Sequence, residues 1–285
     1  MKLNYEELLT MASLGNEVRY SDREVILYAL GIGFGRDPLN RKELKFVYEN
    51  DLQTVPTMAT VLSMGLPTLA RAPIDWMLLV HGEQRLTLHK PLPPFDAEII
   101  ADERCVGAVD KGADKGALIF LEKTITDKKT GEKLCTLGSS LFARGNGGFG
   151  GPKEGGPVPH DLPKRAPDVT VECDTRPDQA LLYALSGDRN PLHRDPVIAK
   201  LAGFERPILQ GLCTYGTACR AILQGVLDYD ARRISGFDAR FSAPVYPGET
   251  ILTDMWVDGA VVSFESKAKE RGVAVLKNGK CTLVA

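Results

Sequence analysis

Apolar residues along the first 144 positions follow two successive spacings, which predict helices first and strands afterwards. Ser21 followed three places later by Glu24 is typical of a helix start, and the apolar run 25–30 continues that helix until the glycines from residue 31 onward end it. A second apolar stretch, 57–64, predicts another helix. From residue 76 the apolar runs become short, as in strands. The predicted strands are 77–80, 85–88, 98–101, 117–121 and 134–143.

The same order of elements returns after a stretch rich in glycine and proline. Residues 145–167 contain seven glycines and five prolines, a composition that predicts a linker long enough to cross one face of a domain. Beyond it, Asp195-Pro196 marks a helix start, and Asp258-Gly259 marks a hairpin turn. The predicted helices are 179–185, a short one from 196, and 211–226, and the predicted strands are 234–241, 250–257, 261–268, 273–276 and 281–284.

Short words recur at matching positions in the two halves, which indicates an internal duplication. Pro38 and Pro91 match Pro191 and Pro244, and each pair is separated by 53 residues (91 − 38 and 244 − 191). The sequence therefore predicts two copies of one domain. The predicted boundaries are 1–144 for the first domain, 145–167 for the linker and 168–285 for the second domain.

Composition narrows the class of protein. Hydrophobic residues make up 44% and charged residues 25%, as in soluble globular proteins, and the formal net charge of −2 gives no global field that would attract nucleic acid. The six cysteines form no Cys-x-x-Cys pair, so reduced thiols are expected rather than disulfides or a zinc site. The N-terminus has acidic residues where a signal peptide has an apolar core, no apolar run could cross a membrane, and the C-terminus is not a peroxisomal tripeptide. These features predict a cytoplasmic location.

One loop of the second half concentrates the groups suited to chemistry. Residues 186–193 place Asp188, Asn190 and His193 between the helix breakers Gly187 and Pro191. A carboxylate can accept a proton and an imidazole titrates near neutrality, so this loop is a candidate for acid–base work. The matching positions of the first half hold Gly35, Asp37 and Asn40, which supply neither the base nor the imidazole. One site per chain is therefore expected.

The second half closely resembles the (R)-specific 2-enoyl-CoA hydratases, a MaoC-like family also called hydratase 2. The resemblance is carried by Tyr183-Ala184-Leu185-Ser186-Gly187-Asp188-Arg189-Asn190-Pro191-Leu192-His193 and by Pro207-Ile208-Leu209-Gln210-Gly211-Leu212. The first half resembles the companion domain of the two-domain, eukaryote-type members, at His81-Gly82-Glu83-Gln84 and Lys90-Pro91-Leu92-Pro93. The resemblance implies an α+β double hot-dog fold, in which a long helix is wrapped by an antiparallel sheet in each half and the halves pack as a pseudo-dimer.

The resemblance also implies a set of roles. Asp188 and His193 would activate a water that attacks C3 of a trans-2-enoyl-CoA, Asn190 would position them, and the Gly211 N–H would stabilise the thioester enolate. The residues implied in substrate binding are His81, Gly82, Lys111, Arg189, Pro191, Leu192 and Phe241. No metal and no separate cofactor is expected, because coenzyme A is part of the substrate. Gln210 departs from the histidine that many relatives carry before the glycine. The resemblance further implies a homodimer active in fatty acid β-oxidation.

Other interpretations remain open on the residues alone. Lys111 suits a phosphate contact or an ordinary hairpin turn, Phe241 suits a ligand contact or core packing, and a histidine at the place of His81 is often structural. For the whole protein, the alternatives are a dehydratase of a specialised short or branched hydroxyacyl-CoA or acyl-carrier thioester, a non-catalytic acyl-CoA binding protein, and a thioesterase of the same fold class.

Overall fold

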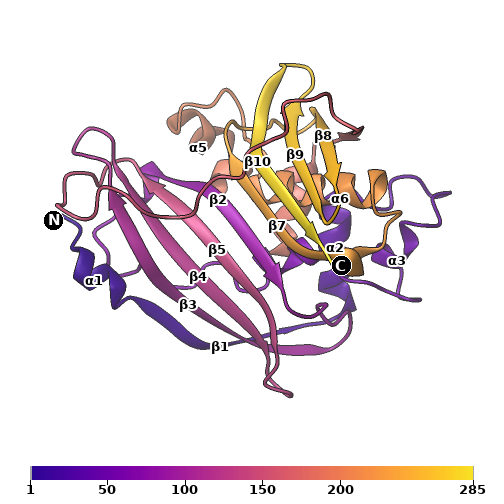
Figure 1. The fold of residues 1–285 in the computed structure, drawn as a ribbon, viewed down its shortest axis with the longest axis horizontal. Coiled ribbons are helices and arrows are strands. Elements are labelled where there is room, and N and C mark those ends of the chain that lie inside the picture. The colour runs from indigo at the N-terminus through magenta and orange to yellow at the C-terminus, as the bar shows by residue number, and fades with distance from the viewer. Residues whose placement is uncertain (1, 285) are drawn as a thin grey trace.

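The two halves contribute five antiparallel strands each to a single ten-stranded sheet, shown in Figure 1. The structure is a computed structural model that describes residues 2–284. The strands of the first half are β1 (Ala12–Tyr20), β2 (Leu79–Leu88), β3 (Ala97–Asp110), β4 (Ala117–Asp127) and β5 (Lys133–Ala143). Those of the second half are β6 (Val169–Asp174), β7 (Ile234–Phe241), β8 (Thr250–Asp258), β9 (Val261–Ala268) and β10 (Val273–Leu283).

The order of strands repeats between the halves and is mirrored across the middle of the sheet. The order is β1-β3-β4-β5-β2 in the first half and, read from the opposite edge, β6-β8-β9-β10-β7 in the second. The halves meet where β2 pairs with β7, from Glu83 opposite Arg240 to Thr87 opposite Gly236. Two copies of one unit therefore share one sheet, as the matching words in the sequence predict.

Helices gather on one face of this sheet. The longest is α6 (Gly211–Gly225), and α2 (Asp22–Gly31) packs close to it. Ser21 and Glu24 form the predicted capping box at the start of α2. A Cβ at Gly216 would lie 2.6 Å from Ile32 Cγ2, so only glycine lets α6 approach α2 this closely. The short helices are α1 (Tyr5–Leu9), α3 (Leu44–Val47), α4 (Gln179–Tyr183) and α5 (Pro196–Leu201), with 3₁₀ turns η1 (Pro56–Thr60), η2 (Trp76–Leu78), η3 (Ala184–Ser186), η4 (Pro191–His193) and η5 (Ala231–Arg233).

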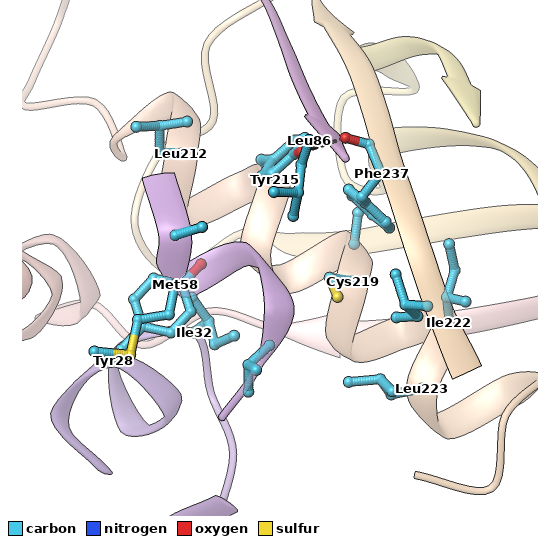
Figure 2. Close-up of a cluster of buried hydrophobic side chains, with 14 of the residues drawn as sticks. Tyr28, Ile32, Met58, Leu86, Leu212, Tyr215, Cys219, Ile222, Leu223 and Phe237 are labelled. Carbon is cyan, nitrogen blue, oxygen red and sulfur yellow. Dashed lines mark hydrogen bonds between the residues drawn. The ribbon is translucent and has the colours of Figure 1, made fainter. Parts of the chain in front are cut away.

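The main hydrophobic core is shared by the two halves rather than divided between them. Figure 2 shows side chains of the first half, among them Tyr28, Ile32 and Met58, beside α6, whose apolar side chains face the sheet. Tyr215 and Phe237 stack edge to face with ring centroids 4.8 Å apart. Burying one continuous apolar cluster makes each half depend on the other for its stability.

The predicted linker runs across the face of the sheet opposite α2 and α6 (Figure 1). Residues 145–167 contain no helix or strand, and side-chain hydrogen bonds hold them in place. The Asn278 amide donates to the carbonyl of His160 over 2.9 Å, and the Trp256 indole N–H donates to the carbonyl of Arg165 over 2.8 Å. The six cysteines are buried and free, as expected.

Several elements differ from the prediction, each for a physical reason. The strands predicted at 77–80 and 85–88 belong to one strand, β2, and those at 273–276 and 281–284 to another, β10. In β10 the residues Asn278-Gly279 resemble a turn but form an irregularity in the ladder. Three short elements, α1, β1 and β6, were not predicted; α1 and β1 carry few regularly spaced apolar residues, whereas β6 alternates Val169, Val171 and Cys173 but directly follows the predicted linker.

The helix predicted over 57–64 is only the 3₁₀ helix η1 followed by turns. All five residues of η1 are buried, so their apolar character reflects burial on every side rather than one face of a longer helix. No helix of residues 2–284 has both the length and the apolar character needed to cross a bilayer. Met1 and Ala285, on which the interpretation of the two chain ends partly depends, lie outside the described residues.

Candidate active site

The loop that follows α4 and η3 is held in shape by its own backbone. Gly187 has a φ of +132°, a value that glycine adopts most easily. The backbone N–H of Asn190 donates to Asp188 Oδ1 over 3.2 Å, and the Asn190 amide oxygen accepts from the N–H of Leu192 over 3.0 Å. The loop therefore fixes the Asp188 carboxylate before any substrate arrives.

Asp188 and His193 lie face to face at this loop. His193 Nε2 is 3.8 Å from Asp188 Oδ2, and the two side chains are 10% and 19% exposed, so they are sheltered but within reach of a small molecule. Since a carbonyl can only accept, the 2.9 Å contact between His193 Nδ1 and the carbonyl of Ile208 places the imidazole proton on Nδ1. Burial lowers the pKa of His193 against the opposing pull of the Asp188 charge. The neutral ring therefore turns an unprotonated Nε2 toward the carboxylate.

The start of α6 lies beside this pair. Gly211 is the first residue of α6, as predicted, and the first N–H groups of a helix have no partner within it. Its backbone is exposed, while the next eight residues are buried. A Cβ at Gly211 would lie 3.3 Å from the ring of Phe241, and that ring is 4.9 Å from the ring of His81. The exposed start of α6 thus lies against Phe241 of the second half, which in turn contacts His81 of the first half.

Gln210 connects these two parts of the site. Its side chain is fully buried, and its amide nitrogen donates to the carbonyl of Ala180 over 2.9 Å and reaches the carbonyl of Asp188 at 3.5 Å. Its amide oxygen has no hydrogen-bond partner within residues 2–284. The residue that departs from the family pattern therefore joins α4, the Asp188 loop and the start of α6.

The structure brings some of the remaining predicted residues to this centre and sets Lys111 apart from it. His81 donates from Nε2 to the carbonyl of Glu83 over 3.0 Å, and burial lowers its pKa to about 4. Gly82 lies against the carbonyl of Ser140, 3.2 Å from where a Cβ would be. Arg189 and Pro191 are exposed and Leu192 is half-buried, all in the Asp188 loop. Lys111 is exposed in the β3–β4 hairpin, which packs on the first residues of the linker.

A cavity of about 220 Å³ beside the site was not foreseen from the sequence. Leu212 and His81 line it, and so does Met64, which lies close to Gly187 of the Asp188 loop. Its inner wall carries a buried ion pair between Glu103 and Lys123, with 3.2 Å between Glu103 Oε2 and Lys123 Nζ. The available signal was a charged residue at the same alternating positions as the buried Ala101 and Cys105 of β3.

The arrangement of these groups indicates which chemistry the site can perform. A carboxylate and a neutral imidazole face each other next to a free helix N-terminus, between two halves that share a sheet. Such a site can orient a water, move a proton and stabilise a nearby anion. It offers no obvious metal centre, since residues 2–284 contain no group of three or more His, Cys, Asp or Glu side chains that could hold an ion.

Comparisons with known proteins identify the family. The family model described as MaoC like domain matches residues 159–278, and that described as MFE-2 hydratase 2 N-terminal domain matches residues 18–145. The chain is 41% identical over 276 residues to "Enoyl-CoA hydratase 2, peroxisomal" of Arabidopsis thaliana, covering 90% of this chain and 88% of that one. It is 42% identical over 270 residues to "Enoyl-CoA hydratase ChsH3" of Mycobacterium tuberculosis, covering 92% of each.

A solved structure agrees with these matches. The MaoC-like dehydratase from Phytophthora capsici superposes with a TM-score of 0.88 at 31% identity, covering 99% of this chain and 98% of that one. The shared ten-stranded sheet is the double hot-dog fold, as the resemblance implied. The chain therefore belongs to the MaoC-like family, in the two-domain form of the enoyl-CoA hydratase 2 proteins.

Proposed function

We propose that this protein is a hydro-lyase that reversibly adds water to trans-2-enoyl-CoA and forms the (3R)-3-hydroxyacyl-CoA. The observation that carries the proposal is the pair of proton acceptors, Asp188 Oδ2 and His193 Nε2, 3.8 Å apart beside the free N-terminus of α6. The relatives named enoyl-CoA hydratase support the substrate class.

The two acceptors explain how one water becomes a nucleophile. A water that donates one proton to Asp188 and the other to His193 Nε2 directs an oxygen lone pair away from both groups. As the C3–O bond forms, one O–H bond breaks and Asp188 takes the proton. The same pair delivers a proton to C2, so one water is added in full and no electron donor is needed. General acid–base catalysis of this kind contributes about 10²- to 10⁴-fold in rate.

The negative charge that develops on the thioester oxygen needs a donor. The backbone N–H of Gly211 is suited to this role, because the helix start leaves it unpaired and favours an anion. The absence of a side chain lets the thioester approach beneath Phe241. A donor of this type contributes about 3–4 kcal/mol to lowering the barrier.

Binding of the CoA would draw on both halves. His81 and Gly82 of β2 lie on the first-half side of the site, and Phe241 of β7 lies on the second-half side. Exposed Lys111 and Arg189 can attract the phosphates of CoA as cations. Because β2 and β7 are hydrogen-bonded neighbours, neither half alone would form the complete site.

A spectroscopic assay tests the proposal. Purified protein added to crotonyl-CoA should remove the absorbance of the conjugated double bond without releasing free thiol, and chiral analysis should identify the (3R) product. Thiol release would instead select a thioesterase, and binding without turnover would select an acyl-CoA binding protein. Turnover only of short branched or carrier-bound thioesters would select the specialised dehydratase.

A further inference from the structure

The cavity of about 220 Å³ lies mainly in the first half, and three of its lining residues are next to parts of the proposed reaction centre. Leu212 follows Gly211 directly, His81 contacts Phe241, and Met64 lies close to Gly187. Trp76 also lines the cavity and is 58% exposed, so the cavity is reached from solvent. An acyl tail extending from C3 into the first half would occupy this space, and the inference below therefore rests on the proposed hydration.

The wall of the cavity is not that of a simple hydrocarbon pocket. Glu103 and Lys123 lie directly opposite each other on β3 and β4, and their side chains are only 12% and 10% exposed. Removing an ion pair from water costs several kcal/mol per charge, and a well-packed apolar pair in the same place is often equally stable or more so. A pocket for unsubstituted hydrocarbon would therefore favour aliphatic side chains here, as at the neighbouring Leu121 and Leu141.

The ion pair also has hydrogen-bonding capacity left over. Lys123 Nζ uses one proton toward Glu103 and a second toward the carbonyl of Ser63, at 2.8 Å, which leaves a third. Glu103 accepts from Lys123 and from the Thr68 hydroxyl, at 2.6 Å, and its carboxylate can accept more. The buried Ser63 hydroxyl has no partner among the described residues. A donor and an acceptor are thus available on one wall.

We propose that this cavity selects an acyl tail that carries a hydroxyl group near its far end. A hydroxyl can accept from Lys123 and donate to Glu103 at once, whereas a keto oxygen can only accept and a carboxylate would be repelled by Glu103. The volume holds about seven groups of the size of a water molecule, at ~30 Å³ each. That room fits the five carbons and terminal oxygen that follow C3 in an eight-carbon hydroxyacyl tail.

The test compares three substrates with the full-length protein. These are crotonyl-CoA, trans-2-octenoyl-CoA and 8-hydroxy-trans-2-octenoyl-CoA. We expect the hydroxylated substrate to exceed the plain eight-carbon one in kcat/KM by about 10- to 100-fold, because a plain tail leaves the polar wall unpaired. Equal values for the two would overturn the inference.

A paired substitution separates the polar wall from general effects. Glu103→Leu with Lys123→Met should abolish or invert the preference while leaving turnover of crotonyl-CoA unchanged, because that substrate has no tail to reach the wall. The control, Asp254→Leu with Lys267→Met, removes an ion pair of the second half that does not line the cavity and should retain the preference. A preference that survives the first pair would contradict the inference.

Binding gives a measurement that does not depend on catalysis. Calorimetric titration of wild-type protein with 8-hydroxyoctanoyl-CoA and octanoyl-CoA should show the same 10- to 100-fold preference, on the order expected for one satisfied polar wall. If crotonyl-CoA is not turned over but the binding preference holds, the proposed hydration fails and the assignment of the cavity stands. If turnover holds and neither preference appears, only the assignment of the cavity fails.

Discussion

The loop at residues 37–40 and the loop at residues 190–193 make the same backbone hydrogen bonds but carry different side chains. In the first, Asp37 accepts from the N–H of Leu39 over 2.9 Å, and the N–H of Asn40 donates to the carbonyl of Asp37 over 3.1 Å. In the second, the Asn190 side-chain oxygen accepts from the N–H of Leu192 over 3.0 Å, and the backbone N–H of His193 donates to the carbonyl of Asn190 over 3.2 Å. The two loops therefore share their backbone hydrogen bonds and differ in their side chains.

The surroundings of the first loop make it a packing element. Gly35, at the place of Asp188, donates its N–H to Glu43, which forms an almost fully buried ion pair with Arg220 of α6 at 2.8 Å. Asn40, at the place of His193, donates to the Tyr229 hydroxyl over 3.1 Å. These contacts attach the first half to the second, and glycine at the position of Asp188 leaves no carboxylate there to accept a proton.

The helices next to the two loops also differ, in whether their first residue has a backbone N–H. Where the second half has α6, which begins at Gly211 with a free N–H, the first half has η1, which begins at Pro56 and so has no N–H to offer. Loss of the base, the imidazole and the anion donor in one half coincides with a cavity in that half. On the mechanism proposed above, the second half would perform the chemistry and the first half would accommodate the substrate.

The strongest test of this division replaces the base. Asp188→Asn should lower kcat/KM by about 10²- to 10⁴-fold, because the amide cannot take a proton from water. Folding should persist, since the amide oxygen can still accept from the N–H of Asn190. Enoyl-CoA hydration and circular dichroism are the measurements, and Asp37→Asn is the matched control. Activity within threefold of wild type in Asp188→Asn would remove the basis of the mechanism.

The anion donor is the next test. Gly211→Ala should lower kcat by about 10²-fold, because the new methyl group stands 3.3 Å from Phe241 and blocks the approach of the thioester to the N–H. The double variant Gly211→Ala with Phe241→Leu distinguishes two causes. If activity returns, crowding against Phe241 was responsible; if it stays low, the methyl group itself obstructs the donor.

The pH profile tests the protonation state of the imidazole. Burial lowers the pKa of His193, so the neutral ring should persist at pH 6.5 and kcat/KM should fall about tenfold per pH unit only at lower pH. His81, with a pKa of about 4, affects stability in the same direction. Between pH 6.5 and 4, His81 binds a proton in the unfolded chain but not in the folded protein. The free energy of unfolding should therefore decrease as the pH is lowered through this range. A kcat/KM that rises on acidification would contradict the assignment.

The smallest effect is expected in the first loop. Asp37→Ala removes one hydrogen bond and should cost about 1 kcal/mol in the free energy of unfolding, with kcat/KM unchanged. Asn190→Ala should cost a similar stability and also reduce kcat/KM, because it loosens the backbone that holds Asp188. Denaturant unfolding and kinetics on both variants give the comparison. Equal kinetic effects in the two loops would argue against a division of labour.

The sequence predicted the repeated order of elements from matching words in the two halves, and it predicted several helices and strands from local patterns. The capping box at Ser21, the helix start at Gly211 and the strand at 261–268 are each determined by nearby residues. Residues 81–84 were not predicted as part of a strand, although β2 runs through them. His81 and Gln84 line the cavity, and these polar residues break the alternation of apolar positions. Residues selected for a site thus disturbed the pattern from which strands are predicted.

The ion pair between Glu103 and Lys123 could not be predicted from the sequence, for a different reason. The two residues are 20 positions apart, and they meet only through the register of β3 with β4. The partnership of Gln210 with Ala180 and Asp188 is likewise a product of tertiary packing. Contacts between distant positions depend on register and on closure of the fold, which composition and spacing do not encode.

The junction between β2 and β7 also has a consequence for synthesis on the ribosome. Strand β2 ends at Leu88, and its partner β7 begins at Ile234, so about 146 residues must be made before that edge can pair. At ~5–20 residues per second this leaves β2 with one open edge for roughly 7–30 s, the condition under which strands pair with other chains. Translation products that stop before β7 should therefore aggregate through the open edge of β2.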